Sequence, residues 1–296
     1  MKNVLVPGIF KFFGLLPLSW ARAIGSAVGS CMGLVKSRSY QTTFKNLRNC
    51  FPDLTDAEIR NLTLESLKET GKTAVEAGLI WRNSWPWLKS KIVAVENEEL
   101  LRSELAQGRG LLVLAPHLGN WEVVAPYLAS IAPLTAMYQP AELPGLDALI
   151  LKGRSKIDIS MAPTNRKGVS MLLKALQKGT IVGILPDQVP EKGSGAEPAP
   201  FFGRPAMTMS LVHALVGRTQ CRVVSVFAMR VPGGFKLITL PVAPEIYSEN
   251  SSESIAGLNS SVEACVRLAL PQYQWEYNRF KSLPAHLRGK KTSADC

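Results

Sequence analysis

His117 and Glu122 lie five positions apart in the stretch APHLGNWE, and they could form a proton-transfer pair. A carboxylate that accepts a hydrogen bond from one imidazole nitrogen fixes the ring tautomer and leaves the other nitrogen free to take a proton. The sequence contains no G-x-S-x-G motif, and no cysteine lies near this stretch, so the nucleophile would be a substrate hydroxyl. The chemistry that these residues indicate is general base catalysis on an alcohol.

The two side chains can meet only if the chain turns between them. In a continuous helix, residues five apart point about 140° away from each other. Pro116 and Gly119 favour a turn instead, with Asn120 as the N-cap of a helix that carries Glu122 in its first turn. The alternative is a strand that runs into a helix containing a His and a Glu by coincidence, because this spacing also arises by chance.

The elements around this stretch predict an α/β fold. Residues 110–115 form an apolar run after a glycine, which predicts a buried strand ending just before His117. Further strands are predicted at 135–139, 157–162, 180–187, 221–231 and 235–241. Helices are predicted over 143–154, 166–179, 207–218 and 252–270, and a helix with a Thr55–Glu58 capping box starts near residue 56. This alternation is typical of a mixed, largely parallel sheet flanked by helices.

Ligands of such sheets bind beyond the carboxyl ends of the strands. Two loops meet this condition: the one that contains His117 and the one over residues 186–206, which follows the strand at 180–187. The second loop is long and rich in proline and glycine, and we expect it to be a functional loop and not a hairpin.

The charge of the chain points to an anionic partner. Lys and Arg number 34 against 23 acidic residues, which gives a net charge of +11 and a pI of about 9.5. Such a surplus suits an acidic membrane face, an acidic protein or a phosphorylated substrate. No zinc-finger spacing, arginine-rich tract or aromatic RNA-binding motif is present, so we expect no nucleic-acid partner. The five cysteines are scattered, which argues against a zinc site or a disulfide framework.

The N-terminal residues 3–35 are strongly apolar and contain Lys11 and Arg22. No window reaches the roughly 20 uninterrupted apolar residues of a clean membrane span. Pro7 and Pro17 are expected to break the segment into two helices. We interpret residues 1–38 as membrane-associated anchor helices, whose basic side chains reach lipid headgroups, and residues 39–296 as the catalytic domain. The alternative is a pair of core helices.

Ordered blocks along the chain resemble a known family. Besides VLAPHLGNWE, the blocks are residues 46–58, 137–156, 165–188, 201–208 and 271–281. In this order they are similar to the late acyltransferases of bacterial lipid A biosynthesis, a branch of the H-x4-D/E lysophospholipid acyltransferase superfamily. The resemblance covers nearly the full length and implies a glycerolipid-acyltransferase-like fold. It departs at Gln139, where the family often has Arg, and at Tyr277 and Asn278, where it usually has His and Arg.

The resemblance implies an enzyme on the cytoplasmic face of the bacterial inner membrane. Such an enzyme moves an acyl chain from acyl carrier protein to a hydroxyl of a lipid A precursor, with the acyl thioester as co-substrate and with no metal or other cofactor. His117 would be the general base and Glu122 its orienting partner. Arg154 would bind substrate phosphate or stabilise developing charge, and Asp187 would line the same site.

Four more residues complete the candidate substrate-binding set: Asn120, Lys167, Arg204 and Arg279. Each candidate also has a structural interpretation. Arg154 could be a cation at a helix C-terminus, Asp187 a cap or turn residue, and Lys167 and Arg204 solvated surface charges.

Other functions remain open from the sequence. The acceptor could be another glycolipid or a lysophospholipid, or the His–Glu pair could activate water in a hydrolase. A non-enzymatic lipid-binding protein held to anionic membrane by its charge is the third class.

Overall fold

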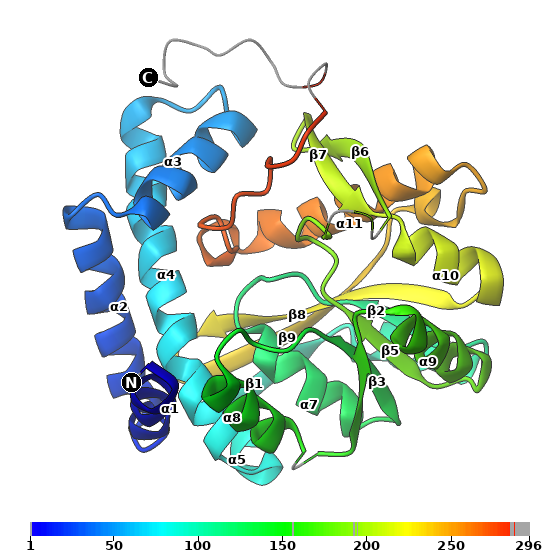
Figure 1. The fold of residues 1–296 in the computed structure, drawn as a ribbon, viewed down its shortest axis with the longest axis horizontal. Helices are drawn as coiled ribbons and strands as arrows, with labels where there is room; N and C mark the ends of the chain where they lie inside the picture. The colour runs from blue at the N-terminus through cyan, green and yellow to red at the C-terminus, as the bar shows by residue number, and fades with distance from the viewer. Residues whose placement is uncertain (1, 156, 192, 194, 285–286, 288–296) are drawn as a thin grey trace.

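The sheet is mixed and largely parallel, as the sequence predicts. A computed structural model describes residues 2–155, 157–191, 193, 195–284 and 287 (Figure 1). Seven of its described strands form one sheet in the order β1-β9-β8-β2-β5-β3-β4, and all neighbours in it are parallel except β8 and β9. The strands of this sheet are β1 (Ile92–Glu96), β2 (Leu111–Leu114), β3 (Leu134–Tyr138), β4 (Ile159–Pro163), β5 (Ile181–Ile184), β8 (Arg222–Val231) and β9 (Gly234–Pro241).

Helices cover the sheet and gather at one side of it (Figure 1). In chain order, the helices before β2 are α1 (Lys2–Phe13), α2 (Leu18–Leu34), α3 (Arg38–Cys50), α4 (Asp56–Arg82), α5 (Trp85–Lys89) and α6 (Glu98–Ala106). The helices after β2 are α7 (Val124–Ala129), α8 (Pro144–Arg154), α9 (Arg166–Gln177), α10 (Leu211–Thr219) and α11 (Ser251–Leu268). Short 3-10 helices are η1 (Trp121–Val123), η2 (Pro244–Tyr247) and η3 (Leu270–Gln272).

β2 lies in the middle of the sheet and is buried on both faces. Leu111 and Val113 pack into a core with α6 and α7, whereas Leu112 and Leu114 pack into a core with α9, α10 and α11. A parallel strand that is covered on both faces consists of a continuous run of apolar residues, and for this reason β2 can be predicted from the sequence. The capping box is also confirmed, since the Thr55 backbone N–H donates to the Glu58 carboxylate and the Glu58 backbone N–H donates to the Thr55 hydroxyl.

One expectation for the loop after β5 is wrong. The structure has an antiparallel hairpin there, β6 (Ala196–Phe201) with β7 (Arg204–Met209). The sequence does not predict this hairpin because its strands contain three prolines, Pro198, Pro200 and Pro205, and proline has no N–H to donate to a neighbouring strand. A two-stranded hairpin tolerates proline because no further strand pairs with its outer edges, so no N–H donor is needed there. The strand β7 also moves the start of the following helix, which begins at Leu211 and not at 207.

The N-terminal segment forms two helices as expected, and the break lies at Pro17 but not at Pro7. Pro7 lies inside α1, whereas Pro17 caps α2. No described helix is both long and apolar enough to cross a membrane. α2 packs against α4 at glycines: a Cβ on Gly29 would come within 2.1 Å of the Leu67 carbonyl, and one on Gly71 within 2.0 Å of the Gly25 carbonyl. The two backbones are therefore in direct contact.

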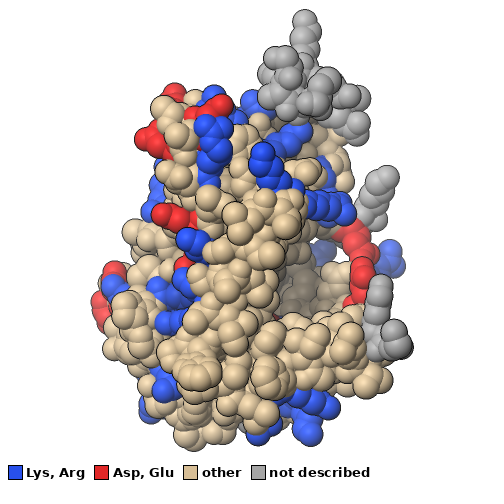
Figure 2. All heavy atoms as spheres, turned by 90° about the vertical axis from the view of Figure 1, so that its left-hand side faces the viewer, with Lys and Arg blue, Asp and Glu red and all other residues tan. Residues whose placement is uncertain are grey.

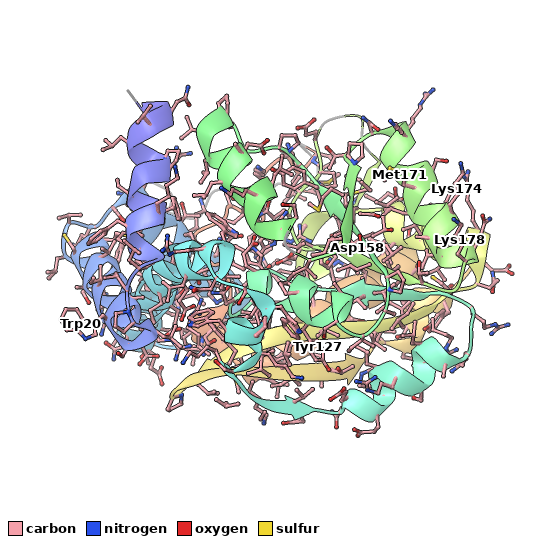
Figure 3. All side chains as sticks on the ribbon, turned by 90° about the horizontal axis from the view of Figure 1, so that it is seen from below. Trp20, Tyr127, Asp158, Met171, Lys174 and Lys178 are labelled. Atoms are coloured by element: carbon pink, nitrogen blue, oxygen red, sulfur yellow. The ribbon has the colours of Figure 1, made fainter. Side chains whose placement is uncertain are left out.

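The outward face of α1 and α2 is apolar. Large apolar side chains on it are well exposed, among them Leu5 at 59%, Leu15 at 61%, Trp20 at 66% and Leu34 at 84%. Trp20 lies at the outer margin of the molecule (Figure 3). The middle of this side is largely free of charged atoms, whereas Lys and Arg gather above it and the surface is hollowed beside it (Figure 2). We name the exposed apolar side chains of Val4, Leu5, Ile9, Phe12, Leu15, Trp20, Val28, Leu34 and Val35 the apolar face.

Arg22 does not point to this face. Its Nε donates to Glu76 of α4 at 2.6 Å, and its two terminal nitrogens donate to the carbonyls of Val231 and Gly234. The expectation that Arg22 reaches lipid headgroups is therefore wrong. Because the guanidinium is used inside the protein, α2 presents an uninterrupted apolar surface outward.

Candidate active site

His117 and Asp187 meet at the carboxyl ends of two neighbouring strands. β2 and β5 are parallel partners in register, with Leu114 opposite Ile184. Since both strands end at the same edge of the sheet, the residues three positions after each end lie side by side. His117 Nδ1 donates to Asp187 Oδ1 at 2.9 Å, and the His117 backbone N–H donates to Oδ2 at 3.0 Å. One residue therefore engages both carboxylate oxygens.

The Asp187 carboxylate is held ionised although it is buried. Burial alone would raise the pKa of Asp187, but the positive charge and the two hydrogen bonds of His117 outweigh it and lower the pKa below its ordinary value. An ionised carboxylate can only accept, so Nδ1 carries a proton, and in the neutral imidazole the lone pair is then on Nε2. This is the tautomer that a general base requires.

Nε2 of His117 lies next to the Gln188 side chain, which is held in turn by Gln274. The amide nitrogen of Gln188 lies 3.3 Å from Nε2 and donates to Gln274 Oε1 at 2.9 Å. The imidazole also lies against the Trp121 ring, with centroids 4.9 Å apart. Its side chain is 13% exposed, so Nε2 is screened but within reach of a ligand that displaces the Gln188 amide.

Glu122 pairs with Arg154 and not with His117. Arg154 Nη2 donates to Glu122 Oε1 at 2.6 Å, and its Nε donates to Oε2 at 3.3 Å. Trp81 Nε1 donates to the same Oε2 at 2.9 Å. The predicted hydrogen bond from the imidazole to Glu122 is therefore replaced by the one to Asp187, because η1 turns Glu122 toward α8 and α4.

Arg154 is the last residue of α8 and lies mostly inside the protein. Burial alone would lower the pKa of Arg154, but the Glu122 carboxylate holds the pKa above its ordinary value. The guanidinium also lies over the Tyr138 ring, 5.2 Å from its centroid. α8 reaches this place because Gly153 approaches the α4 backbone: a Cβ there would lie 2.8 Å from Trp81 Cα. The pair lines a small pocket.

That pocket is small, and its lining is mixed. Its wall comes from α4, α5, α7 and the end of α8, and it includes the apolar residues Ile80, Trp85, Leu88, Pro126 and Ile157 and the polar residues Asn83 and Ser84. Glu122 and Arg154 also line it. A lining of this kind suits a ligand with a hydrocarbon portion and a polar group.

The turn between His117 and Glu122 has the form that the sequence predicts. Gly119 has φ +62°, and a Cβ on it would lie 2.0 Å from the Ala228 carbonyl, so glycine is needed for both conformation and space. Asn120 is the N-cap of η1 and accepts from the Glu122 backbone N–H at 3.2 Å. The stretch is therefore not one straight helix.

The other predicted substrate-binding residues are either held in the interior by the protein's own groups or exposed on the surface. Asn120 is fully buried, and its amide donates to Glu76. Arg279 is also buried: its terminal nitrogens donate to Met207 O, to the Thr208 hydroxyl and to Asn259. The structure thus places these two inside the protein, which corrects the expectation of substrate contact. Lys167 and Arg204 are exposed surface residues.

Three residues of the site carry no local sequence signal as site residues. Trp81 lies near the end of a long helix, and Gln188 and Gln274 belong to loops 86 residues apart. Their roles depend on which strands are neighbours. The sheet order puts the end of β5 next to the end of β2. The sequence alone does not give this order. Among the described residues, no group of three His, Cys, Asp or Glu side chains is placed to share a metal ion.

Comparison with known proteins gives a consistent result over nearly the whole chain. Residues 2–282 match the family model described as bacterial lipid A biosynthesis acyltransferase. The chain is 28% identical over 280 residues to a lipid A biosynthesis lauroyltransferase of Escherichia coli K12, which covers 94% of this chain and 90% of that protein. It is 26% identical over 282 residues to a lipid A biosynthesis palmitoleoyltransferase of the same organism, with the same coverage of both chains. A lipid A biosynthesis acyltransferase of Haemophilus influenzae is 26% identical over 285 residues, covering 93% of this chain and 89% of that protein.

Proposed function

Because the chain belongs to the bacterial lipid A biosynthesis acyltransferase family and is an acyltransferase, we propose that it acylates a lipid A precursor from acyl carrier protein. The donor is a fatty acyl thioester and the acceptor is a hydroxyl group of the precursor. A thioester is already activated, so the proposed reaction uses no metal or nucleotide.

The observation that carries this proposal is the hydrogen-bonded His117–Asp187 pair, in which Asp187 engages Nδ1 and Nε2 is the ring nitrogen left for a substrate. Asp187 holds the proton on Nδ1 through the 2.9 Å hydrogen bond. The acceptor hydroxyl takes the place of the Gln188 amide at Nε2 and gives up its proton there. The hydroxyl oxygen forms a bond to the thioester carbonyl carbon, the C–S bond breaks, and the imidazolium returns the proton to the departing thiolate. Asp187 stabilises the imidazolium between the two transfers.

Glu122 and Arg154 supply the second part of the proposed site. Their ion pair lines the small pocket between α4, α5, α7 and the end of α8, and the acyl carbonyl is proposed to approach the protein there. Arg154 is proposed to contact a substrate phosphate or the developing negative charge. On this proposal Glu122 holds Arg154 in place, and its partner is not His117.

The proposed location is the cytoplasmic face of the bacterial inner membrane. The apolar face of α1 and α2 supports it, because such a surface binds in the plane of the headgroups when its apolar side chains enter the lipid. The net charge of +11 adds attraction to anionic lipid and to an acidic carrier protein. Exposed Lys167 and Arg204 are proposed as part of the surface that meets the carrier protein or lipid phosphates.

The test is acyl transfer by the purified protein. Wild type is incubated with acyl carrier protein thioester and a lipid A precursor, and we expect the precursor to gain the mass of one acyl chain while free thiol appears. His117→Ala should lower the rate by about 10²- to 10⁴-fold. His213→Ala in α10 is the matched control and should leave it unchanged. Thiol release without acylated lipid would mean hydrolysis. Lipid binding without thiol release would mean a binding protein, and both results contradict the proposal.

A further inference from the structure

A buried network of charged side chains lies beneath the turn that carries His117. Its centre is Glu76 of α4, which is fully buried. Glu76 Oε1 accepts from Arg22 Nε of α2 at 2.6 Å. Glu76 Oε2 accepts from Arg230 Nε of β8 at 2.7 Å and from the Asn120 amide at 2.8 Å. One carboxylate thus joins a helix of the N-terminal pair, the sheet and the turn.

Arg230 holds the same turn by a second path. Its Nη2 donates to the Gly119 carbonyl at 3.0 Å and also to the Thr73 hydroxyl. Its Nη1 donates to Glu69 at 3.2 Å. The peptide between Gly119 and Asn120 is therefore fixed at its carbonyl by Arg230, and at the following side chain by Glu76.

These contacts determine the direction of the Asn120 side chain. Asn120 Oδ1 must accept from the Glu122 backbone N–H, which starts η1. That orientation points the amide nitrogen to the opposite side, where only an acceptor satisfies it, and Glu76 is that acceptor. Since Glu76 is also the carboxylate partner of Arg22 and, together with Glu69, of Arg230, it cannot turn away without weakening both ion pairs.

We propose that Glu76 and Arg230 are positioning residues that hold the His117–Glu122 turn in its reactive geometry. They touch neither base nor acceptor, and act through Asn120 and the Gly119 carbonyl. Through Arg22 the same network ties the position of α2 to the turn. The effect on rate rests on the proposed function; the effect on the imidazole does not.

The first measurement reads the imidazole directly. The chain has three histidines, so the ring signals of a ¹⁵N-histidine sample can be assigned with His117→Ala. Wild type should show His117 protonated at Nδ1. Glu76→Gln keeps the shape and removes the charge, and it should shift or broaden this signal as the contact with Asp187 loosens. The matched control is Glu104→Gln. Glu104 pairs with Arg222 at the other end of β8 and has no contact with the turn, so its removal should leave the signal unchanged.

The second measurement is kinetic. Glu76→Gln should lower kcat by about 10- to 100-fold with little change in KM, because a small displacement of the base affects the reaction more than binding. Arg230→Lys keeps the charge beside Glu76 but lacks the second nitrogen that reaches Gly119. It should fold and show a similar, smaller loss of kcat, which keeps the test valid if Glu76→Gln does not fold. Glu104→Gln should have wild-type kcat.

The outcomes separate this inference from the proposed function. A wild-type His117 signal and wild-type kcat in both Glu76→Gln and Arg230→Lys would overturn the positioning role. A disturbed imidazole in these variants, in a protein that shows no acyl transfer at all, would support the positioning role while contradicting the proposed reaction. Equal disturbance in Glu104→Gln would overturn it too, since the effect would then be general loss of packing.

Discussion

Glu122 and Arg154 form a two-point ion pair, with Nη2 to Oε1 at 2.6 Å and Nε to Oε2 at 3.3 Å. The pair joins the turn after β2 to the end of α8. The family signature of a histidine and a glutamate five residues apart therefore describes, in this structure, two carboxylate partnerships. Asp187 serves His117, and Glu122 serves Arg154.

The first prediction concerns Asp187. Asp187→Asn should fold and bind substrate but lower kcat by roughly 10³-fold or more, because a neutral amide can present its N–H to the ring and select the wrong tautomer. Initial rates with saturating thioester measure this effect. A kcat within threefold of wild type would show that the His117–Asp187 hydrogen bond is not part of the reaction.

The ion pair of Glu122 and Arg154 predicts a non-additive response. Glu122→Gln and Arg154→Gln should each destabilise by about 1–3 kcal/mol, between the values for exposed and fully buried pairs. The double variant should lose clearly less free energy of unfolding than the sum of the losses in the two single variants, since each single change leaves one charge unpaired. Urea unfolding of the four proteins completes the cycle. Simple additivity would mean that the pair contributes no coupling.

Gly119 should be intolerant of any side chain. Gly119→Ala places a Cβ 2.0 Å from the Ala228 carbonyl and demands a left-handed conformation, φ +62°, so we expect a loss of about 2 kcal/mol or more. Gly233→Ala in the β8–β9 turn is the matched control: φ is +80° but nothing lies within 4 Å of the new Cβ. Thermal unfolding should show the larger shift for Gly119, and acyl transfer should fall only there.

Glu276 predicts a pH-dependent gain in stability. Burial raises the pKa of Glu276, although a hydrogen bond from Thr70 at 2.8 Å partly offsets it. A carboxyl whose pKa is raised by folding opposes folding once it ionises, so stability falls as pH rises above the unfolded pKa, about 4.3. Glu276→Gln should therefore raise Tm at pH 7, and the difference should vanish near pH 4. Exposed Glu249→Gln should show neither effect.

The apolar face predicts membrane association. Leu15→Gln, Trp20→Gln and Leu34→Gln together should reduce sedimentation with anionic vesicles by tenfold or more, since burying each such side chain is worth about 1.5–3 kcal/mol. Val93→Gln with Leu268→Gln, at exposed apolar positions outside the N-terminal helices, should leave sedimentation unchanged. Equal binding of all three proteins would assign the attraction to charge alone.

Much of the fold can be predicted from the chain, because its signals are local. β2 reads as an apolar run, α4 has its capping box, and α9 is followed by Gly179 with φ +77°. The turn at His117 is also legible, through Pro116 and Gly119. The hairpin β6–β7 is not, since its prolines hide the strand pattern.

The sequence predicts which residues belong to the site, but it does not predict which of them are hydrogen-bonded or ion-paired to each other. His117 and Asp187 each follow an apolar strand, but their contact depends on β2 and β5 being neighbours, 70 residues apart in sequence. Glu122 finds Arg154 because α8 packs against α4 at Gly153. Arg279 gives no sign in the sequence that its guanidinium is used in the interior. Pairings of this kind depend on tertiary packing, which residue spacing does not contain.

The inward direction of Arg22 has a consequence for any shortened form of this protein. A chain trimmed to begin at α3 would lose the guanidinium beside Glu76 and would open the glycine-lined groove of α4 to solvent. Glu76 would keep Arg230 and Asn120 as partners, but breaking one buried ion pair can cost up to roughly 3–5 kcal/mol, a large share of the stability of a typical domain. Solubility is therefore better sought by replacing the outward side chains of α1 and α2 than by removing these helices.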